Sequence, residues 1–93
     1  MEEKFVAVWL ANREKAIHFG VKMRPVDPAE AMKTAHRWLS GHRESDGFFQ
    51  LAAKGRLDLS LEALAISKQF TALFSDDEAN NALTRLLGAG YHF

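Results

Sequence analysis

The chain has 93 residues, of which 47% are hydrophobic, and its twelve basic and twelve acidic side chains give a formal net charge of zero. This length supports one modest core, which buries about 60–65% of the surface that the unfolded chain exposes. The absence of cysteine excludes disulfides, zinc–thiolate sites and cysteine nucleophiles. The neutral charge argues against strong, sequence-independent binding to nucleic acid or anionic lipid.

Charge is unevenly distributed along the chain. Residues 12–56 carry nine Lys/Arg against five Asp/Glu, whereas residues 57–93 carry two against five. A solvated surface explains this pattern most simply, and two charged faces that steer a partner are the alternative. The apolar segment at residues 5–11 is too short to span a bilayer and follows acidic residues. We therefore expect a soluble, cytoplasmic protein with no membrane partner.

Residues 4–23 fit two different templates. As a helix closed by Gly20, the segment gathers its large apolar side chains on one arc. As a β-hairpin with a turn at residues 12–15, it alternates apolar and polar residues from position 17 to position 24. Good helix formers and the lack of a turn pair favour the helix, and the β-hairpin remains the alternative.

Capping residues predict the next two helices. Asp27 is a suitable N-cap, Pro28 suits the first turn, and Gly41 ends a helix over residues 28–40. The apolar stripe of this helix consists of Ala31, Met32, Ala35, Trp38 and Leu39. A short third helix begins at Ser45 or Asp46 and stops at Gly55.

The C-terminal part predicts a helical hairpin. One helix runs from Asp58 or Ser60 to Phe74, and the last begins at Ser75, where Ser75 and Glu78 form a capping box. We expect the following residues of the last helix to face the core: Ala79, Ala82, Leu83, Leu86 and Leu87. Its unassigned polar side comprises Asn80, Asn81, Thr84 and Arg85. The whole chain, residues 1–93, is thus predicted to be mainly α, a compact single domain of four to five short capped helices.

No motif marks a reactive site. The four histidines lack the spacing of metal ligands, the glycines occur singly at helix ends, and no nucleophile is paired with a base. Asp76 and Asp77 suit the positive end of a helix dipole. We therefore expect no catalytic residue, metal or cofactor, and a protein that is not an enzyme.

Binding is the function that remains. A basic cluster follows the second helix and its exit, and an aromatic tail follows the last glycine. The predicted partner-binding residues are Lys33, His36, Arg37, Arg43, Tyr91 and Phe93. We interpret the chain as a small non-enzymatic protein–protein interaction module, an accessory regulator, adaptor or inhibitor of the sort that mobile elements often encode. A homodimer would hide surplus aromatic surface.

The alternative is a nucleic-acid-binding protein that uses the basic helix 28–40 and the following turn. In a helix-turn-helix, the third helix would then enter the major groove. That helix offers Gln50 and Lys54 as contacts, with Phe48 and Phe49 near its start.

Overall fold

This computed structural model describes residues 1–91, which contain five α-helices and three short 3₁₀ turns. The α-helices are α1 (Glu2–His18), α2 (Ala31–Ser40), α3 (Phe48–Ala53), α4 (Leu61–Ala65) and α5 (Asp76–Gly88). The 3₁₀ turns are η1 (Pro28–Glu30), η2 (Leu57–Leu59) and η3 (Thr71–Leu73). Residues 1–91 contain no strand, so the predicted mainly α fold is confirmed.

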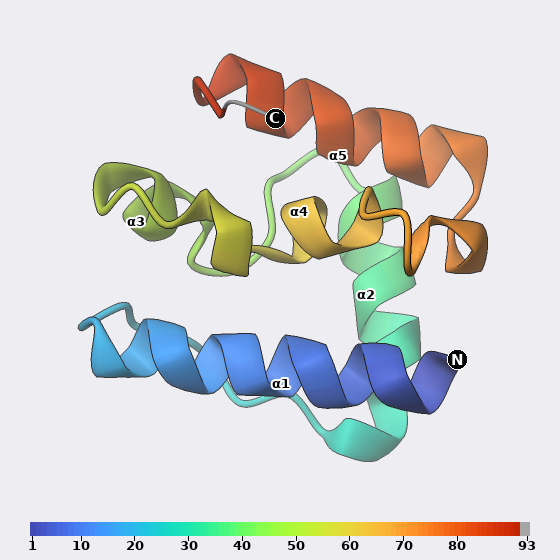
Figure 1. Ribbon diagram of the computed structural model, residues 1–93, viewed down its shortest axis with the longest axis horizontal. Coiled ribbons are helices and arrows are strands. Elements are labelled where there is room, and N and C mark those ends of the chain that lie inside the picture. The colour runs from blue at the N-terminus through green and yellow to red at the C-terminus, as the bar shows by residue number, and fades with distance from the viewer. Residues whose placement is uncertain (92–93) are drawn as a thin grey trace.

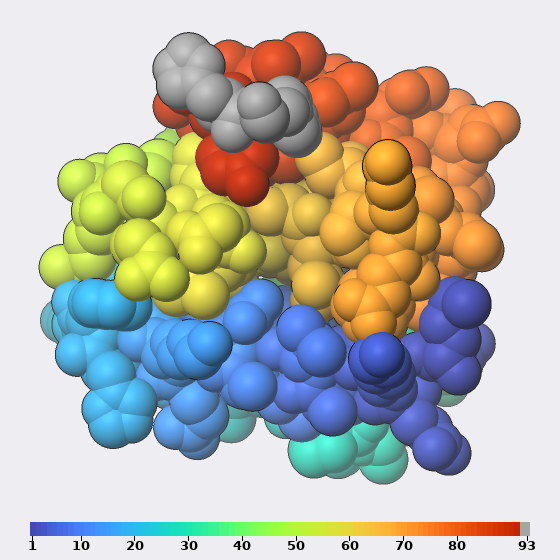
Figure 2. All heavy atoms as spheres, in the orientation of Figure 1, coloured from blue at the N-terminus to red at the C-terminus, as the bar shows by residue number. Residues whose placement is uncertain are grey.

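The helices are arranged in layers (Figure 1). Helices α1 and α5 form the two outer layers and run in the same direction, while α3, η2 and α4 lie between them. Helix α2 crosses the layers at a steep angle and packs against both α5 and α1. The space-filling view shows the middle layer filling the space between α1 and α5 (Figure 2).

The β-hairpin alternative for residues 4–23 is wrong. Residues 2–18 are helical, and Gly20 ends α1 with a φ of 88°. The N–H of Gly20 donates to Ile17 and the N–H of Val21 to Ala16, which satisfies the last carbonyls of the helix. The alternation at residues 17–24 that suggested a strand covers the end of α1 and the start of the irregular segment 21–27. In it, Val21 is buried while Lys22 and Arg24 are exposed.

The predicted helix from residue 58 or 60 to residue 74 is also wrong in length. Helix α4 starts at the expected cap, Ser60, but it stops at Ala65. The hydroxyl of Ser67 donates to the Leu64 carbonyl, and a turn follows. This break lets Phe70 and Phe74 both pack edge-on against Phe5, at ring-centroid distances of 5.4 and 5.2 Å. Aromatic packing therefore overrides the helical periodicity.

Helix α5 begins as predicted, and part of its predicted apolar face is buried, since Ala82 and Leu86 are fully buried. Both halves of the capping box form: the Ser75 hydroxyl accepts from the Glu78 N–H, and the Glu78 carboxylate accepts from the Ser75 N–H. However, Leu83 and Leu87 are 38% and 57% exposed, so the expectation that they face the core is wrong. The polar residues Asn81 and Arg85 point at α2 and donate to carbonyls near its end.

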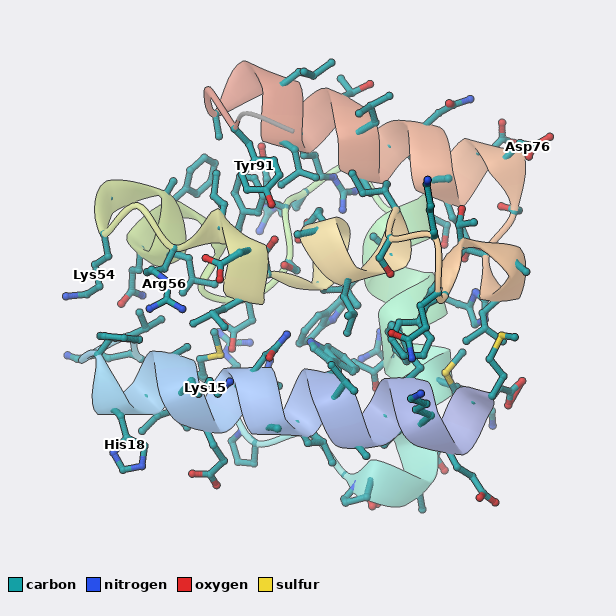
Figure 3. The ribbon with its side chains drawn as sticks, in the orientation of Figure 1. Lys15, His18, Lys54, Arg56, Asp76 and Tyr91 are labelled. Carbon is teal, nitrogen blue, oxygen red and sulfur yellow. The ribbon has the colours of Figure 1, made fainter. Side chains whose placement is uncertain are left out.

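Two groups of buried side chains form the core. The first surrounds Phe5 and Trp9 of α1 and the second surrounds Phe48 and Leu51 of α3. Tyr91 packs against the second group, and its side chain lies between α5 and the middle layer (Figure 3). No helix within residues 1–91 is both long enough and apolar enough to cross a bilayer.

A candidate binding groove lined by arginines

The six arginines of the chain fall into two classes. Arg13, Arg56 and Arg85 each pair with an acidic side chain. The other three make no ion pair or side-chain hydrogen bond with any residue of the described range 1–91, and all of them line one surface groove. These three are Arg24, Arg37 and Arg43.

The arginine groove has a volume of about 600 Å³ and is built from three parts of the chain. Helix α2 supplies Arg37 and the half-buried Trp38, and the irregular segment 21–27 supplies Arg24. The turn at residues 41–46 supplies the remaining lining residues, which are Gly41, His42, Arg43, Glu44 and Asp46.

Arg13 holds one wall of the arginine groove in place. Its guanidinium lies near the rings of Trp9 and Trp38, at 5.7 and 5.8 Å from their centroids, and it donates to the Arg24 carbonyl. Burial lowers the pKa of Arg13, and the nearby Asp46 opposes that shift. Because arginine stays protonated at any physiological pH, Arg13 balances the charge of Asp46, whose carboxylate also accepts from the Arg24 N–H at 2.7 Å.

Helix α5 holds the other wall. Helix α2 ends at Gly41 in an extended conformation that leaves its last carbonyls without intrahelical donors. Arg85 donates to the carbonyls of Trp38 and Gly41 at 3.1 and 2.8 Å, and Asn81 donates to the Leu39 carbonyl at 2.8 Å. Asn81 and Arg85, which the sequence left without a role, thus cap α2 from a neighbouring helix.

A buried acid completes this wall. The Glu62 carboxylate is fully buried and lies 3.2 Å from Arg85. It accepts hydrogen bonds from both the backbone N–H and the hydroxyl of Ser45, which is also buried. The turn that carries His42 and Arg43 is therefore fixed at both ends, by Arg85 at Gly41 and by Glu62 at Ser45.

The predicted partner-binding residues do not form one cluster. Arg37 and Arg43 line the arginine groove. Lys33 is exposed and lies 3.8 Å from Glu30, and His36 is bonded to Glu78 at 2.7 Å. Tyr91 is half-buried against the second core group. Phe93 lies outside the described residues.

Sequence reasoning missed Arg24 as a member of the groove. The alternation of residues 17–24 suggests a strand only as the alternative to a helix. In the structure, Asp46 accepts from the Arg24 N–H and Arg13 donates to the Arg24 carbonyl, which places Arg24 beside α2. The sequence nevertheless indicates that Arg24 is not helical, because Pro25 directly after it disfavours the helical conformation.

A second groove, of about 480 Å³, lies on the other side of the same turn. It shares Gly41, His42 and Glu44 with the arginine groove. Its remaining lining residues are Ser40, Phe48, Phe49, Asn81, Thr84, Arg85, Gly88 and Ala89. Phe49 is 67% exposed, and its ring meets Phe48 edge-on at 5.6 Å. We call this surface the Phe49 groove.

The predicted nucleic-acid-reading helix is short. Helix α3 has six residues, of which Phe48 and Leu51 are buried. The Gln50 side-chain oxygen accepts from the Lys22 N–H at 3.0 Å and so serves the fold. Lys54 lies beside Arg56 at the end of the molecule where α1 ends (Figure 3).

Within residues 1–91, no three His, Asp or Glu side chains converge as metal ligands do. No protein-family model, curated protein or solved structure matches the chain.

Proposed function

We propose that this protein is a small non-enzymatic interaction module that binds an acidic segment of a protein partner in the arginine groove. The observation that carries the proposal is that all three arginines without an ion pair in residues 1–91 line this one groove. In this view the protein works in the cytoplasm as an adaptor, inhibitor or accessory regulator.

The chemistry of the arginine groove suits carboxylates. A guanidinium presents a planar fork of donors that binds a carboxylate through two parallel hydrogen bonds. Of the two acids in the lining, Asp46 is already balanced by Arg13. A ligand carboxylate therefore enters a positive site beside the apolar face of Trp38.

Preorganisation adds to the affinity that we expect. Both walls are held by hydrogen bonds to Asp46, Glu62 and Arg85, so binding orders little of the backbone. A site that is already ordered loses less conformational entropy when a ligand binds. Its positive charge also raises the rate of encounter with an acidic partner.

A nucleic acid is the alternative ligand, because arginine forks bind phosphates as well as carboxylates. The six-residue α3, with Gln50 bonded to Lys22, has little left to contact base edges. The exposed lysine of the basic helix, Lys33, already lies beside Glu30. These features favour an acidic protein segment over a nucleic acid.

The first prediction concerns the arginines of the groove. Titration of the ¹⁵N-labelled protein with a glutamate-rich peptide should shift the Trp38 indole and the Arg24, Arg37 and Arg43 signals. The double charge reversal Arg37→Glu/Arg43→Glu should weaken binding at least about tenfold, since each tenfold step is only about 1.4 kcal/mol. Its unfolding free energy should stay within about 0.5 kcal/mol of the wild type, because exposed charges contribute little.

Lys33→Glu is the matched control, since it reverses a charge on the exposed face of the same helix outside the groove. It should change peptide affinity less than about threefold by the same arithmetic. Equal losses in the control and in the double variant would mean that general charge, and not the groove, binds the peptide. Tighter, steeply salt-dependent binding to single-stranded or duplex DNA would favour the nucleic-acid alternative.

A further inference from the structure

We infer that the partner segment combines acidic residues with an apolar side chain and binds across the turn at residues 41–46. The carboxylates lie in the arginine groove, and the apolar side chain packs on Phe49 in the Phe49 groove. This inference rests on the proposed function and adds the pattern of residues that the partner must carry.

The two grooves are adjacent. Gly41, His42 and Glu44 line both of them, so the turn is their common wall. The bonds from Glu62 to Ser45 and from Arg85 to Gly41 hold that wall in position. A single extended segment that crosses the turn thus contacts both grooves.

The Phe49 groove offers apolar contact, although polar residues line it. Asn81 and Arg85 already donate to carbonyls at the end of α2, and the Ser40 hydroxyl donates to the His36 carbonyl. What remains for a ligand is the exposed ring of Phe49 beside the small residues Gly88 and Ala89. Removing such apolar surface from water is favourable.

Glu44 disfavours an acidic residue of the partner segment at the turn between the two grooves. It lines both grooves, is half-buried, and makes no ion pair within residues 1–91. An acidic residue of the ligand placed at the turn would be repelled by it, whereas a main-chain N–H of the ligand can donate to it. Repulsion of this kind restricts which sequences bind. The segment over the turn is therefore uncharged.

The second prediction tests this pattern with synthetic peptides. One peptide carries three glutamates and a Gly-Ser spacer, and two others add Phe-Leu after the spacer or before it, so that both orders are present. We expect one of the combined peptides to bind the wild type at least about tenfold more tightly than the glutamate-only peptide, a gain of about 1.4 kcal/mol. Isothermal titration calorimetry measures the affinities.

The variant Phe49→Ala should abolish this gain and leave the affinity for the glutamate-only peptide within about twofold. Phe19→Ala is the matched control, because Phe19 is an exposed phenylalanine that lies against Arg56 and lines neither groove. It should leave the gain unchanged. The arginine-groove variant should weaken all three peptides.

Two outcomes overturn the inference in distinguishable ways. If the glutamate-only peptide binds but neither combined peptide binds more tightly, or if the gain survives in Phe49→Ala, the two-groove pattern is wrong and the proposed function stands. If no glutamate-containing peptide shifts the groove signals, the proposed function fails and the inference fails with it.

Discussion

The carboxylate of Glu62 is buried and is bound by Ser45, in the turn at residues 41–46, and by Arg85 of α5. Arg85 balances its charge, and the N–H and hydroxyl of Ser45 donate hydrogen bonds to it. A buried ion pair adds little net stability compared with apolar residues of the same size, because desolvating two charges is costly. Its benefit here is positional: the same guanidinium that meets Glu62 also caps α2 at Gly41.

The third prediction follows from this double role of Arg85. Replacing it by methionine keeps much of the volume, leaves Glu62 buried without its cation, and removes the donor to the Gly41 carbonyl. Loss of one partner of a buried pair costs about 3–5 kcal/mol. Urea unfolding of Arg85→Met, followed by circular dichroism, should show a loss of this size.

Thr84→Ala is the control for Arg85→Met, since Thr84 is exposed on the same helix and should change stability by less than about 0.5 kcal/mol. A loss below about 1 kcal/mol in Arg85→Met would contradict the role assigned to Arg85. The double variant Glu62→Gln/Arg85→Met should lose less than the sum of the two single losses, because contacting residues are coupled.

At the scale of the element, the sequence predicts helix boundaries well where neighbouring residues set them. Ser75 caps α5 as expected. Asp27 also accepts the predicted backbone hydrogen bond, but it caps the 3₁₀ turn η1, so α2 itself begins at Ala31 and not at residue 28. The end of α4 depends on Phe70 and Phe74 reaching Phe5. No local pattern encodes such a contact between distant residues.

The residues of the candidate site were also only partly predictable from the sequence. The sequence identified Arg37 and Arg43, because basic residues cluster at the exit of a predicted helix. It did not separate them from Lys33 and His36. The pair of Glu30 and Lys33 is local, three residues apart, whereas Glu78 meets His36 only because α5 packs on α2. Arginines with and without partners look alike in a sequence.

The fourth prediction concerns the direction in which α5 faces. Leu86 is fully buried, whereas its neighbour Leu87 is 57% exposed. Leu86→Ala should therefore lower the unfolding free energy by about 2–5 kcal/mol, because it leaves a cavity in the core. Leu87→Ala removes the same atoms from the surface and should cost less than about 0.5 kcal/mol.

The pair Leu86→Ala and Leu87→Ala is best measured by urea unfolding under identical conditions, so that each variant serves as the control for the other. Equal losses would mean that α5 is rotated from the orientation described. A larger loss for Leu87→Ala would mean that Leu87 faces the core, as its spacing in the sequence predicts.

At the scale of the whole molecule, the two outer helices α1 and α5 run in the same direction (Figure 1). Their charged residues are arranged along that direction. Asp76 at the start of α5 lies at one end, whereas Lys15 and His18 near the end of α1 lie at the other (Figure 3). Acids at helix starts and bases at helix ends are both favourable to the helix dipoles. In α1 and α5, acidic residues therefore lie at the shared starting end and basic residues at the opposite end.

Helix α2 joins this layered arrangement through polar contacts as well as through the core. Arg13 of α1 lies against Trp38, and Glu78 of α5 is bonded to His36. Because these contacts connect helices that are distant in sequence, breaking one of them should weaken the cooperative unit as a whole and not a single helix. The Glu78 contact is the one that depends on pH.

The fifth prediction is that acid weakens the fold through Glu78. Burial raises the pKa of this carboxyl, but the N–H of Ser75, the bond and charge of His36 and the Ser75 hydroxyl together outweigh burial, so its pKa lies below the ordinary value. A lowered pKa means that the folded state favours the ionised form. The stability from Glu78 is therefore complete above the unfolded pKa of about 4.3 and is lost as the pH falls through the folded pKa.

Glu78→Gln isolates this contribution, because glutamine can still accept from the Ser75 N–H in the capping box but does not titrate. Between about pH 5 and pH 3 the wild type should lose more unfolding free energy than Glu78→Gln, so the two curves converge in acid. Glu30→Gln, which removes an exposed partner of Lys33, should leave the wild-type slope nearly unchanged. Parallel curves for wild type and Glu78→Gln would show that the link between α2 and α5 carries no pH-dependent stability.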